Sequence, residues 1–323
     1  MPEAPGLLEL MVRQVRYEAR DIHSYELVHP LGEDLPGFEA GAHVDVRVGD
    51  SLLRQYSLSN APGERHRYVI GVLRDEQGRG GSRALHETWR VGRRVRVSEP
   101  RNHFALRPGA HRVLLLAGGI GVTPLKAMAH QLHAQGADYA LHYCARDAQC
   151  VAFADALRES LDPARVHLHL DGGDPARGLD IAALLERERR EGTQVYYCGP
   201  AGFMQACADA AASWPPGSVH CEHFKAPPPA AASAQPAEGF TVQIASTGTR
   251  LHVAPRRSIV EVLREAGIEV PTSCEAGLCA TCKTGYLQGE VEHQDCILGP
   301  DEQRTHFTPC VSRARGELLV LDL

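Results

Sequence analysis

Three cysteines fall within nine residues near the C-terminus, in the stretch PTSCEAGLCATC (residues 271–282). Pro, Ser, Gly and Ala surround them, a composition typical of a loop rather than of a helix or strand. Thiols held this close together in a loop have four explanations. They form a zinc site, a disulfide knot or an iron–sulfur cradle, or they are an accident of composition. The choice among these constrains the fold of the C-terminal part of the chain.

The spacing of the cysteines separates these explanations. Cys274, Cys279 and Cys282 are separated by four and two residues, and Cys310 follows after 27 more. This is the C-x4-C-x2-C…C spacing of plant-type [2Fe–2S] ferredoxins, in which four thiolates hold the cluster. Structural zinc typically uses two C-x2-C pairs or Cys/His pairs, whereas one C-x2-C pair occurs here. The spacing favours a [2Fe–2S] cluster, with zinc and coincidence as weaker alternatives.

Cysteine usage elsewhere indicates a reducing compartment. Five of the ten cysteines are scattered singly before residue 222, unlike the disulfide frameworks of short secreted chains. The N-terminal residues contain no basic segment followed by an apolar one, so we expect no secretory signal and a cytoplasmic location. Cys296 breaks the ferredoxin spacing, and we expect it to be buried as a small hydrophobic residue.

Length and charge exclude several classes of protein. The net charge of -6 gives no sign of nucleic-acid binding, which needs a strong basic excess. No run of about 18 apolar residues is present, so we expect no membrane-spanning helix. A chain of 323 residues accommodates two or three domains.

The first two thirds of the chain contain two different patterns. Residues 1–108 contain short strand-like runs with Gly/Pro turns and one expected helix, SRALHETW (82–89), which predicts an antiparallel β-barrel or sandwich. Residues 109–225 alternate apolar strands with amphipathic helices. This alternation predicts an α/β domain with a parallel sheet covered on both faces.

The last third begins after a change of composition. Residues 226–238 are rich in Pro and Ala, which predicts a linker. Residues 239–323 contain strand-like runs around one short helix, for which Ser258 is a suitable N-cap with Glu261 three residues later. This pattern predicts a small α+β domain.

Two motifs in the first segment point to a bound nucleotide. RQYSL (54–58) lies on an expected strand, and GRGGS (78–82) precedes the expected helix. Glycines and a serine at a helix start leave N–H groups free to bind an anion. RQYSL alone is most often surface alternation. Together the two motifs suit a flavin nucleotide.

Two glycine-rich turns occur in the second segment. LLLAGGIGVTPLKAM (114–128) runs from a strand into a helix, for which we expect Thr123 as the N-cap and Pro124 as the first residue. It is similar to the G-x-G-x-x-G fingerprint without matching it. YYCGPAGFM (196–204) follows a later strand. Both turns are expected at the carboxyl ends of parallel strands, where ligands bind, although tight packing alone is an alternative.

The five motifs occur in the order found in the ferredoxin–NADP reductase superfamily. Within it the chain resembles the phthalate dioxygenase reductase and vanillate O-demethylase reductase family, whose ferredoxin domain is also C-terminal. The resemblance runs from about residue 7 to residue 323. It implies an FMN-binding β-barrel domain (1–108), an NAD-binding α/β domain (109–225) and a β-grasp [2Fe–2S] ferredoxin domain (239–323).

The resemblance also implies roles for individual residues. Tyr56 would lie along the flavin ring, Ser57 near its reactive nitrogen, and Cys198 close to the nicotinamide. Phe224 would cover the flavin, although a routine core position is the alternative. Asp171 would bind a ribose hydroxyl, unless it is a solvated strand-end acid. The implied catalytic residues are Ser57, Cys198 and Phe224. The implied cofactor-binding residues are Arg54, Gln55, Tyr56, Ser57, Gly80, Gly81, Ser82, Gly119, Gly121, Val122, Thr123, Asp171, Cys198, Gly199, Pro200 and Phe224, and the metal ligands are Cys274, Cys279, Cys282 and Cys310.

By this resemblance the protein is expected to be an NADH-dependent reductase. Electrons would pass from NADH to FMN, then to the [2Fe–2S] cluster, and then to a Rieske-type non-haem-iron aromatic oxygenase or O-demethylase. No extra segment for an adenine site is evident, which favours FMN over FAD, and NADPH stays open as the donor. We expect a monomer that binds neither nucleic acid nor membrane.

Charge bears on the expected partner. From Glu238 onward the chain has 12 acidic and 8 basic residues. An acidic carrier domain would favour a basic patch on its partner, and a solvated acidic surface is the alternative. Two other functions stay open: a redox-sensing binding module, and a stand-alone flavin reductase of a small molecule.

Overall fold

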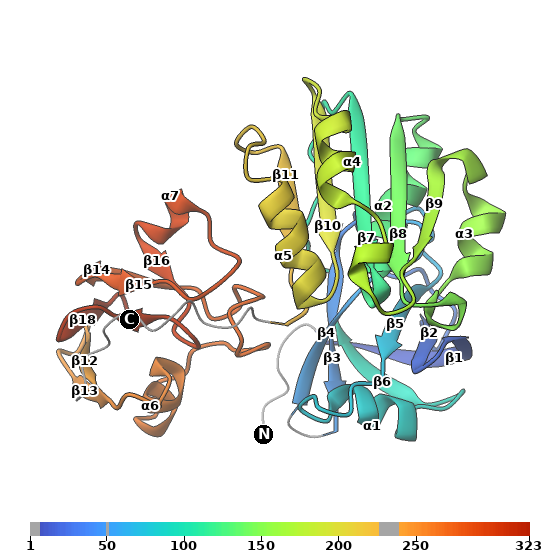
Figure 1. Cartoon of the computed structure of the whole chain (residues 1–323). Helices are drawn as coiled ribbons and strands as arrows, with labels where there is room; N and C mark the ends of the chain where they lie inside the picture. The colour runs from blue at the N-terminus through green and yellow to red at the C-terminus, as the bar shows by residue number, and fades with distance from the viewer. Residues whose placement is uncertain (1–6, 50–51, 226–238) are drawn as a thin grey trace. The chain divides into compact units, whose positions relative to one another are not determined.

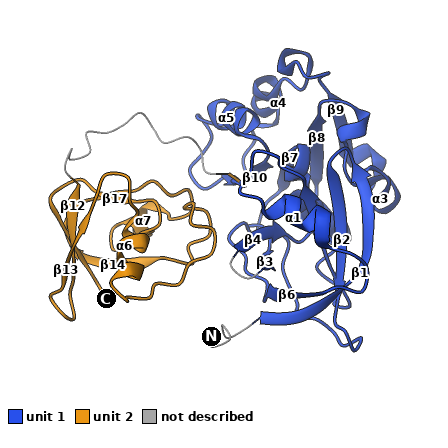
Figure 2. Ribbon diagram, turned by 90° about the horizontal axis from the view of Figure 1, so that it is seen from below, with its two compact units in different colours: residues 1–224 blue, residues 225–323 orange. Residues whose placement is uncertain are grey.

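The computed structural model describes residues 7–49, 52–225 and 239–323. The chain divides into two compact units, residues 1–224 and 225–323 (Figure 2). The expected linker, 226–238, lies outside the described residues. In the described ranges no helix combines the length and apolar character needed to cross a membrane.

The first half of unit 1 is an antiparallel barrel (Figure 1). Its strands lie in the order β4-β3-β6-β1-β2-β5, and neighbouring strands are antiparallel. An isolated antiparallel bridge between Leu58 and Ile70 joins the two outer strands, so the sheet closes on itself. The expectation of a barrel or sandwich therefore resolves to a barrel. The strands are β1 (Leu7–Ala19), β2 (Ile22–Val28), β3 (His43–Val48), β4 (Leu52–Ser57), β5 (Tyr68–Leu73) and β6 (Arg94–Ser98).

One helix, α1 (Gly81–Thr88), packs on this barrel. Leu85 from the helix and Trp89 just after it are buried among the inward-facing residues of the strands. Apolar side chains alternate with polar ones along β6, as expected for a strand with one buried face. Leu85 and Trp89 therefore anchor the helix to the barrel core.

The second half of unit 1 is a parallel five-stranded sheet in the order β11-β10-β7-β8-β9 (Figure 1). Helices α2 and α3 contribute to the hydrophobic core on one face, and α4 and α5 to the core on the other. The expected α/β architecture is confirmed. The elements are β7 (Arg112–Gly118), α2 (Val122–Ala134), β8 (Tyr139–Ala145), α3 (Ala154–Ser160), β9 (Val166–Leu170), α4 (Ile181–Glu188), β10 (Thr193–Cys198), α5 (Ala201–Ala210) and β11 (Val219–Glu222).

Unit 2 is a mixed sheet crossed by one main helix. The strand order is β13-β12-β18-β14-β16, with β12 and β18 parallel, and β15 pairs with β17 beside it. Helix α6 (Ile259–Glu265) begins with the expected capping box of Ser258 and Glu261 and packs on the sheet. This is a β-grasp arrangement. The remaining elements are β12 (Phe240–Ile244), β13 (Arg250–Val253), β14 (Thr284–Gln288), β15 (Val291–Glu292), α7 (Pro300–Gln303), β16 (His306–Phe307), β17 (Arg313–Ala314) and β18 (Leu318–Leu321).

Candidate functional site

The four predicted cluster ligands lie together in unit 2 as two pairs. The Sγ atoms of Cys282 and Cys310 are 3.4 Å apart, and Cys274 is hydrogen-bonded to Cys279. All four thiols are buried. Across the described residues, no three His, Cys, Asp or Glu side chains gather as ligands of one ion. Two thiols for each of two metals fit a binuclear cluster better than a single zinc ion.

The thiols also have the chemistry that a cluster needs. The hydrogen bond with Cys274 lowers the pKa of Cys279 to about 5. The hydrogen bond with Cys310 likewise lowers the pKa of Cys282. Backbone N–H groups of Ala276 and Leu278 donate to the Cys274 sulfur at 3.4 and 3.3 Å. The same hydrogen bonds between cysteines raise the pKa of the partner thiols, Cys274 and Cys310. Each pair thus contains one thiol that ionises readily, and a thiolate is the form that ligates a metal. Four sulfur donors in two pairs fit a [2Fe–2S] cluster.

The backbone of the cysteine loop is bent in an unusual way. Glu275 and Ala280 have φ values of 47° and 53°, in the left-handed region that costs a non-glycine residue about 1–3 kcal/mol. Gly277 has a φ of 70°, and a Cβ there would lie 2.8 Å from Cγ2 of Val311. The loop therefore packs directly on the segment that carries the fourth cysteine.

Cys296 corrects one expectation. Its side chain is exposed, not buried, although its N–H donates to the Gly277 carbonyl at 3.1 Å. A residue beside a curved loop is held here by its main chain, so nothing requires its side chain to enter the core.

The barrel brings the RQYSL and GRGGS motifs together. Arg54 on β4 donates from Nη2 to the Arg79 carbonyl at 3.0 Å, and a Cβ on Gly81 would lie 2.6 Å from Nε of Arg54. Gly80 has a φ of 81° and open space around its missing Cβ. Within the described part of the chain, no side chain makes a capping hydrogen bond at the start of α1. A guanidinium beside an uncapped helix start is suited to a phosphate, and binding of FMN phosphate there stays a prediction.

The next residues of β4 have different surroundings, because neighbouring side chains of a strand point to opposite faces. Gln55 Nε2 lies 3.3 Å from His43 Nε2. Tyr56 is partly buried against the barrel core, and burial raises the pKa of its hydroxyl, so the ring is uncharged. The Ser82 hydroxyl accepts from the Asp75 N–H at 3.1 Å, which anchors the turn before α1.

Ser57 leads to a residue that the sequence analysis missed. Its hydroxyl donates to Oε2 of Glu222 at 3.2 Å, so the end of β4 contacts the end of β11 across the two halves of unit 1. Burial raises the pKa of the Glu222 carboxyl to about 7, and the hydrogen bond from Ser57 offsets part of that rise. Glu222 belongs to the CEHF stretch that holds Phe224, and its ionisable group was the available signal.

The nucleotide turn and the CGP turn meet at the carboxyl ends of β7 and β10. A Cβ on Gly121 would lie 2.2 Å from the Cys198 carbonyl oxygen, and one on Gly118 would lie 2.9 Å from Cδ of Pro200. Gly119 differs, because its φ is 52° and no atom lies within 4 Å of its missing Cβ. Tight packing therefore explains two glycines, and Gly119 leaves backbone accessible to a ligand.

The start of α2 departs from the expected cap. The helix begins at Val122, with Gly121 as N-cap, and Thr123 Oγ1 donates to the Ile120 carbonyl at 3.0 Å. Thr123 is therefore inside the first turn and not its N-cap, and Pro124 is not the first residue. Val122 and Thr123 are both buried, and the Val122 N–H already donates within the turn, to the Gly119 carbonyl.

Cys198, beside Gly199 at the end of β10, is fully buried, and burial raises the pKa of its thiol. It is therefore a neutral thiol and not a nucleophile. Asp171, just after β9, accepts the Gly173 N–H at 2.7 Å through Oδ1. Phe224 is 38% exposed, so the core alternative for Phe224 is wrong.

Comparisons with known proteins identify the parallel-sheet half of unit 1 and the β-grasp unit 2 as separate domains. Residues 115–209 match the family described as oxidoreductase NAD-binding domain, and residues 242–315 match the 2Fe-2S iron-sulfur cluster binding domain. The chain is 52% identical to the tert-butanol monooxygenase / tert-amyl alcohol desaturase reductase subunit of Aquincola tertiaricarbonis, over 98% of this chain and 96% of that protein.

Two further matches extend over nearly the whole chain. Vanillate O-demethylase oxidoreductase of Pseudomonas sp. (strain HR199 / DSM 7063) is 46% identical, over 98% of this chain and 100% of that protein. The solved structure of phthalate dioxygenase reductase, described as modular for electron transfer from pyridine nucleotides to [2Fe-2S], is 43% identical. It covers 98% of both chains with a TM-score of 0.74.

The geometry and these matches agree on the chemistry. The protein is an oxidoreductase that carries electrons from NADH through FMN to a [2Fe–2S] cluster. The barrel with its glycine-rich helix start, the parallel sheet with two glycine turns and the paired thiols correspond to the three parts of this transfer. The chain belongs to the family of the phthalate dioxygenase and vanillate O-demethylase reductases.

Proposed function

We propose that this protein is the reductase component of a Rieske non-haem-iron oxygenase or O-demethylase and delivers single electrons from its cluster to that partner. The observation that carries the proposal is the presence of four paired, buried thiols in a separate unit of a chain that also holds the flavin and nucleotide sites. A cluster in its own unit is suited to serve a protein acceptor. The relatives named as reductases of oxygenases and demethylases support this.

The substrate of the partner is proposed to be a small aromatic compound. The relatives named for vanillate and phthalate support this class. The relative named for tert-butanol adds branched alcohols to the compounds that need testing. We further propose that the reductase works as a monomer in the cytoplasm and binds neither membrane nor nucleic acid.

The barrel residues are proposed to bind and orient the flavin. Arg54 and the N–H groups at the start of α1 bind its phosphate, since a guanidinium and a helix N-terminus both favour an anion. Tyr56, Gln55 and Phe224 contact the ring system. When bound, FMN accepts a two-electron hydride and releases the single electrons that the cluster requires.

The nucleotide is proposed to lie over the two glycine turns, against the main chain of Gly119, Gly121, Val122 and Thr123 on one side and of Gly199 and Pro200 on the other. Cys198 is proposed to lie close to the nicotinamide as a neutral thiol beneath the turn. Asp171 is proposed to accept a ribose hydroxyl through Oδ2, because Oδ1 already accepts the Gly173 N–H.

Ser57 and Glu222 are proposed to hold a proton beside the reacting ring. The Glu222 carboxyl has a pKa of about 7, so near neutral pH it both accepts and donates a proton readily. The Ser57 hydroxyl lies 3.2 Å from that carboxyl and aligns it. Cys274, Cys279, Cys282 and Cys310 are proposed as the cluster ligands.

Reconstitution tests the proposal. The purified protein, loaded with flavin and cluster, is mixed with NADH and with the oxygenase component of a vanillate O-demethylase as the probe acceptor. We expect NADH oxidation coupled to vanillate turnover, and flavin released from the protein to chromatograph as FMN. A protein that reduces ferric or quinone compounds rapidly, yet passes no electrons to Rieske oxygenases for aromatic or branched-alcohol substrates, would be a stand-alone reductase instead. Size-exclusion chromatography tests the monomer.

A further inference from the structure

Lys126 is a buried cation one turn beyond the nucleotide turn. It lies on α2, and its side chain is 7% exposed. Among the described residues, no carboxylate lies within ion-pair distance of its ammonium, although Phe153 lies under it at 5.4 Å. Burying an ammonium without an ion pair is costly unless it is hydrogen-bonded. A lysine in this position therefore calls for a role beyond packing.

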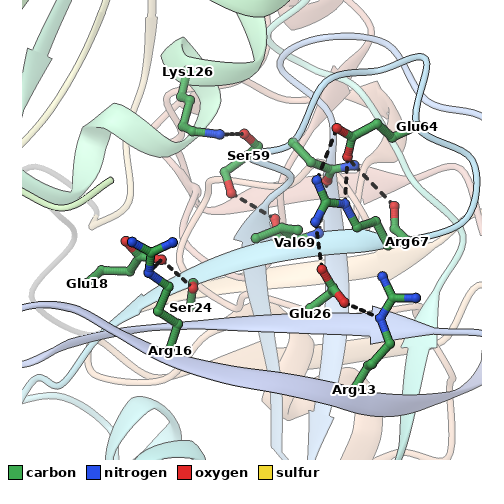
Figure 3. Close-up of polar contacts among 11 residues, drawn as sticks. Arg13, Arg16, Glu18, Ser24, Glu26, Ser59, Glu64, Arg67, Val69 and Lys126 are labelled. Carbon is green, nitrogen blue, oxygen red and sulfur yellow. Dashed lines mark hydrogen bonds and ion pairs between the residues drawn. The ribbon is translucent and has the colours of Figure 1, made fainter. Parts of the chain in front are cut away.

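The ammonium crosses from the nucleotide half of unit 1 to the barrel. Its Nζ donates to the main-chain carbonyl of Ser59 at 2.9 Å (Figure 3). Ser59 is itself held by Val69, whose carbonyl accepts from both the N–H and the hydroxyl of Ser59, at 2.8 and 3.0 Å. Ser59 follows the Leu58 bridge that closes the barrel. Lys126 therefore binds the barrel at the point where the sheet closes, just after the flavin strand β4.

The nearby carboxylates are taken up by other cations, as Figure 3 shows. Glu26 accepts from Arg13 and Arg67, and Arg67 also binds Glu64 at 2.7 Å. Glu18 lies 3.7 Å from Nε of Arg16 and also accepts from the Ser24 hydroxyl at 2.6 Å. These pairs leave the Ser59 carbonyl as the group that Lys126 binds.

A second contact also joins the start of α2 to the barrel. A Cβ on Gly71 of β5 would lie 2.8 Å from Cγ2 of Thr123 in the first turn of α2. The first turn is thus pressed against the barrel where glycine leaves room. One turn later the Lys126 ammonium holds the helix to Ser59. Together the two contacts set the distance between the start of α2, which follows the nucleotide turn, and the barrel that contains the flavin strand.

We propose that Lys126 is a positioning residue for hydride transfer: by binding the Ser59 carbonyl it fixes the distance between the nucleotide turn on α2 and the flavin strand β4. The inference rests on the proposed roles of these two segments. Hydride transfer needs the reacting atoms within near-attack distance, and a displacement of about 1 Å costs about a hundredfold in rate. A hydrogen bond between the two binding elements controls that displacement directly.

Lys126→Met tests the proposal, because it removes the donor and keeps an unbranched apolar chain. Flavin reduction by NADH is measured in a single anaerobic turnover, together with the NADH–flavin charge-transfer absorbance and the NADH dissociation constant. We expect the rate to fall about ten- to hundredfold and the charge-transfer band to weaken, with NADH affinity nearly unchanged. Without NADH, deuterium uptake by residues 57–61 should rise.

Three further variants separate positioning from general destabilisation. Lys126→Arg should restore most of the rate, because the adjoining cavity of about 310 Å³ has room for a guanidinium. Gly71→Ala should slow the transfer by displacing Thr123. Gln131→Leu is the matched control. Gln131 Oε1 accepts the Ala40 N–H at 3.3 Å, so it also joins α2 to the barrel, but farther from the nucleotide turn. It should keep the wild-type rate.

The outcomes are distinct. A Lys126→Met protein that reduces its flavin at the wild-type rate with an unchanged charge-transfer band overturns the inference. Equal slowing by Lys126→Met and Gln131→Leu also overturns it, because the effect would then be loss of interdomain stability alone. A wild-type protein whose flavin NADH does not reduce would instead overturn the proposed function.

Discussion

The two units build their sites in opposite ways. In unit 2, three of the four cluster thiols come from one loop of nine residues, whose backbone is bent into left-handed conformations at Glu275 and Ala280. In unit 1, Ser57 meets Glu222, 165 residues away, and Gly121 meets Cys198. A local site is specified by spacing along the chain. A distributed site is specified by how closely its backbones approach.

The largest expected effect separates the two units. Cys310→Ser removes one of the two thiols at one proposed iron, so the cluster should be lost and cytochrome c reduction should fall to background. NADH-dependent ferricyanide reduction by unit 1 should persist, since flavin and nucleotide sites lie in the other unit. Visible absorbance and the two assays measure this. Cys296→Ser is the control and should keep its cluster. Loss of both activities in Cys310→Ser would contradict the independence of the units.

Glu222→Gln tests the distributed site. Removing the titrating group should lower the rate of flavin reduction by about a hundredfold and flatten its pH dependence around pH 7, where the Glu222 carboxyl has its pKa. Single-turnover reduction across pH 5–9 measures both. Ser57→Ala keeps the titrating carboxyl but removes the hydrogen bond that lowers its pKa, so the pH dependence should persist and shift to higher pH. A wild-type pH profile in Glu222→Gln would rule out the carboxyl as the proton carrier.

The same group links stability to pH. The Glu222 pKa is raised on folding from 4.5 to about 7, so the folded protein holds a proton there that the unfolded chain releases. The free energy of unfolding should therefore decrease as the pH rises from about 4.5 to 7, and this decrease should be smaller in Glu222→Gln. Urea unfolding of both proteins at several pH values measures the difference.

Gly121 and Gly119 belong to the same turn but are constrained differently. Gly121 lies close to another segment of backbone, whereas Gly119 has a left-handed backbone conformation. Gly121→Ala places a Cβ against the Cys198 carbonyl, so it should lower the free energy of unfolding of unit 1 by about 1–3 kcal/mol and weaken NADH binding. Gly119→Ala meets no atom and bears only the left-handed φ of 52°, so its loss should be smaller. Urea unfolding and NADH titration compare them. Equal losses would mean that strain, and not contact, governs the turn.

The smallest expected effect concerns the capping box at the start of helix α6 in unit 2. Ser258→Ala removes the side-chain half of the capping box on α6 and should lower the free energy of unfolding of unit 2 by about 1 kcal/mol. The cluster absorbance should stay unchanged, because Ser258 is not a ligand. Thermal unfolding followed at the cluster band measures it. A loss of cluster in this variant would show that the helix start and the cysteine loop are coupled.

Several features of the fold were predictable because they depend on neighbours in the chain. The capping box of Ser258 and Glu261, the helix after GRGGS and the strand–helix alternation of the nucleotide half all follow from side-chain period and cap chemistry. Closure of the barrel was not settled, because the Leu58–Ile70 bridge joins strands whose pairing no local pattern encodes.

The candidate site, like the fold, was predictable only where its features depend on residues that are close together in the sequence. Thr123 was misassigned as the helix N-cap, because the preceding glycine turn is tight enough to start the helix two residues earlier, with Gly121 as the N-cap. Cys296 was expected inside and is exposed. Glu222 and Lys126 were missed, since an isolated acid or lysine carries no motif and gains meaning only from the partner that folding places beside it.

Cysteine spacing, a glycine-rich helix start and two glycine turns were enough to predict the class of chemistry, because the parts of each motif lie within one turn or loop. How these motifs act together depends on the tertiary structure. It placed the thiols in two pairs, set Gly121 against Cys198, joined Ser57 to Glu222 and buried Lys126 on the Ser59 carbonyl. The physical reason is that folding buries groups and brings distant segments into contact. Burial and contact shift a pKa or set a distance, and neither can be predicted from neighbouring residues in the sequence.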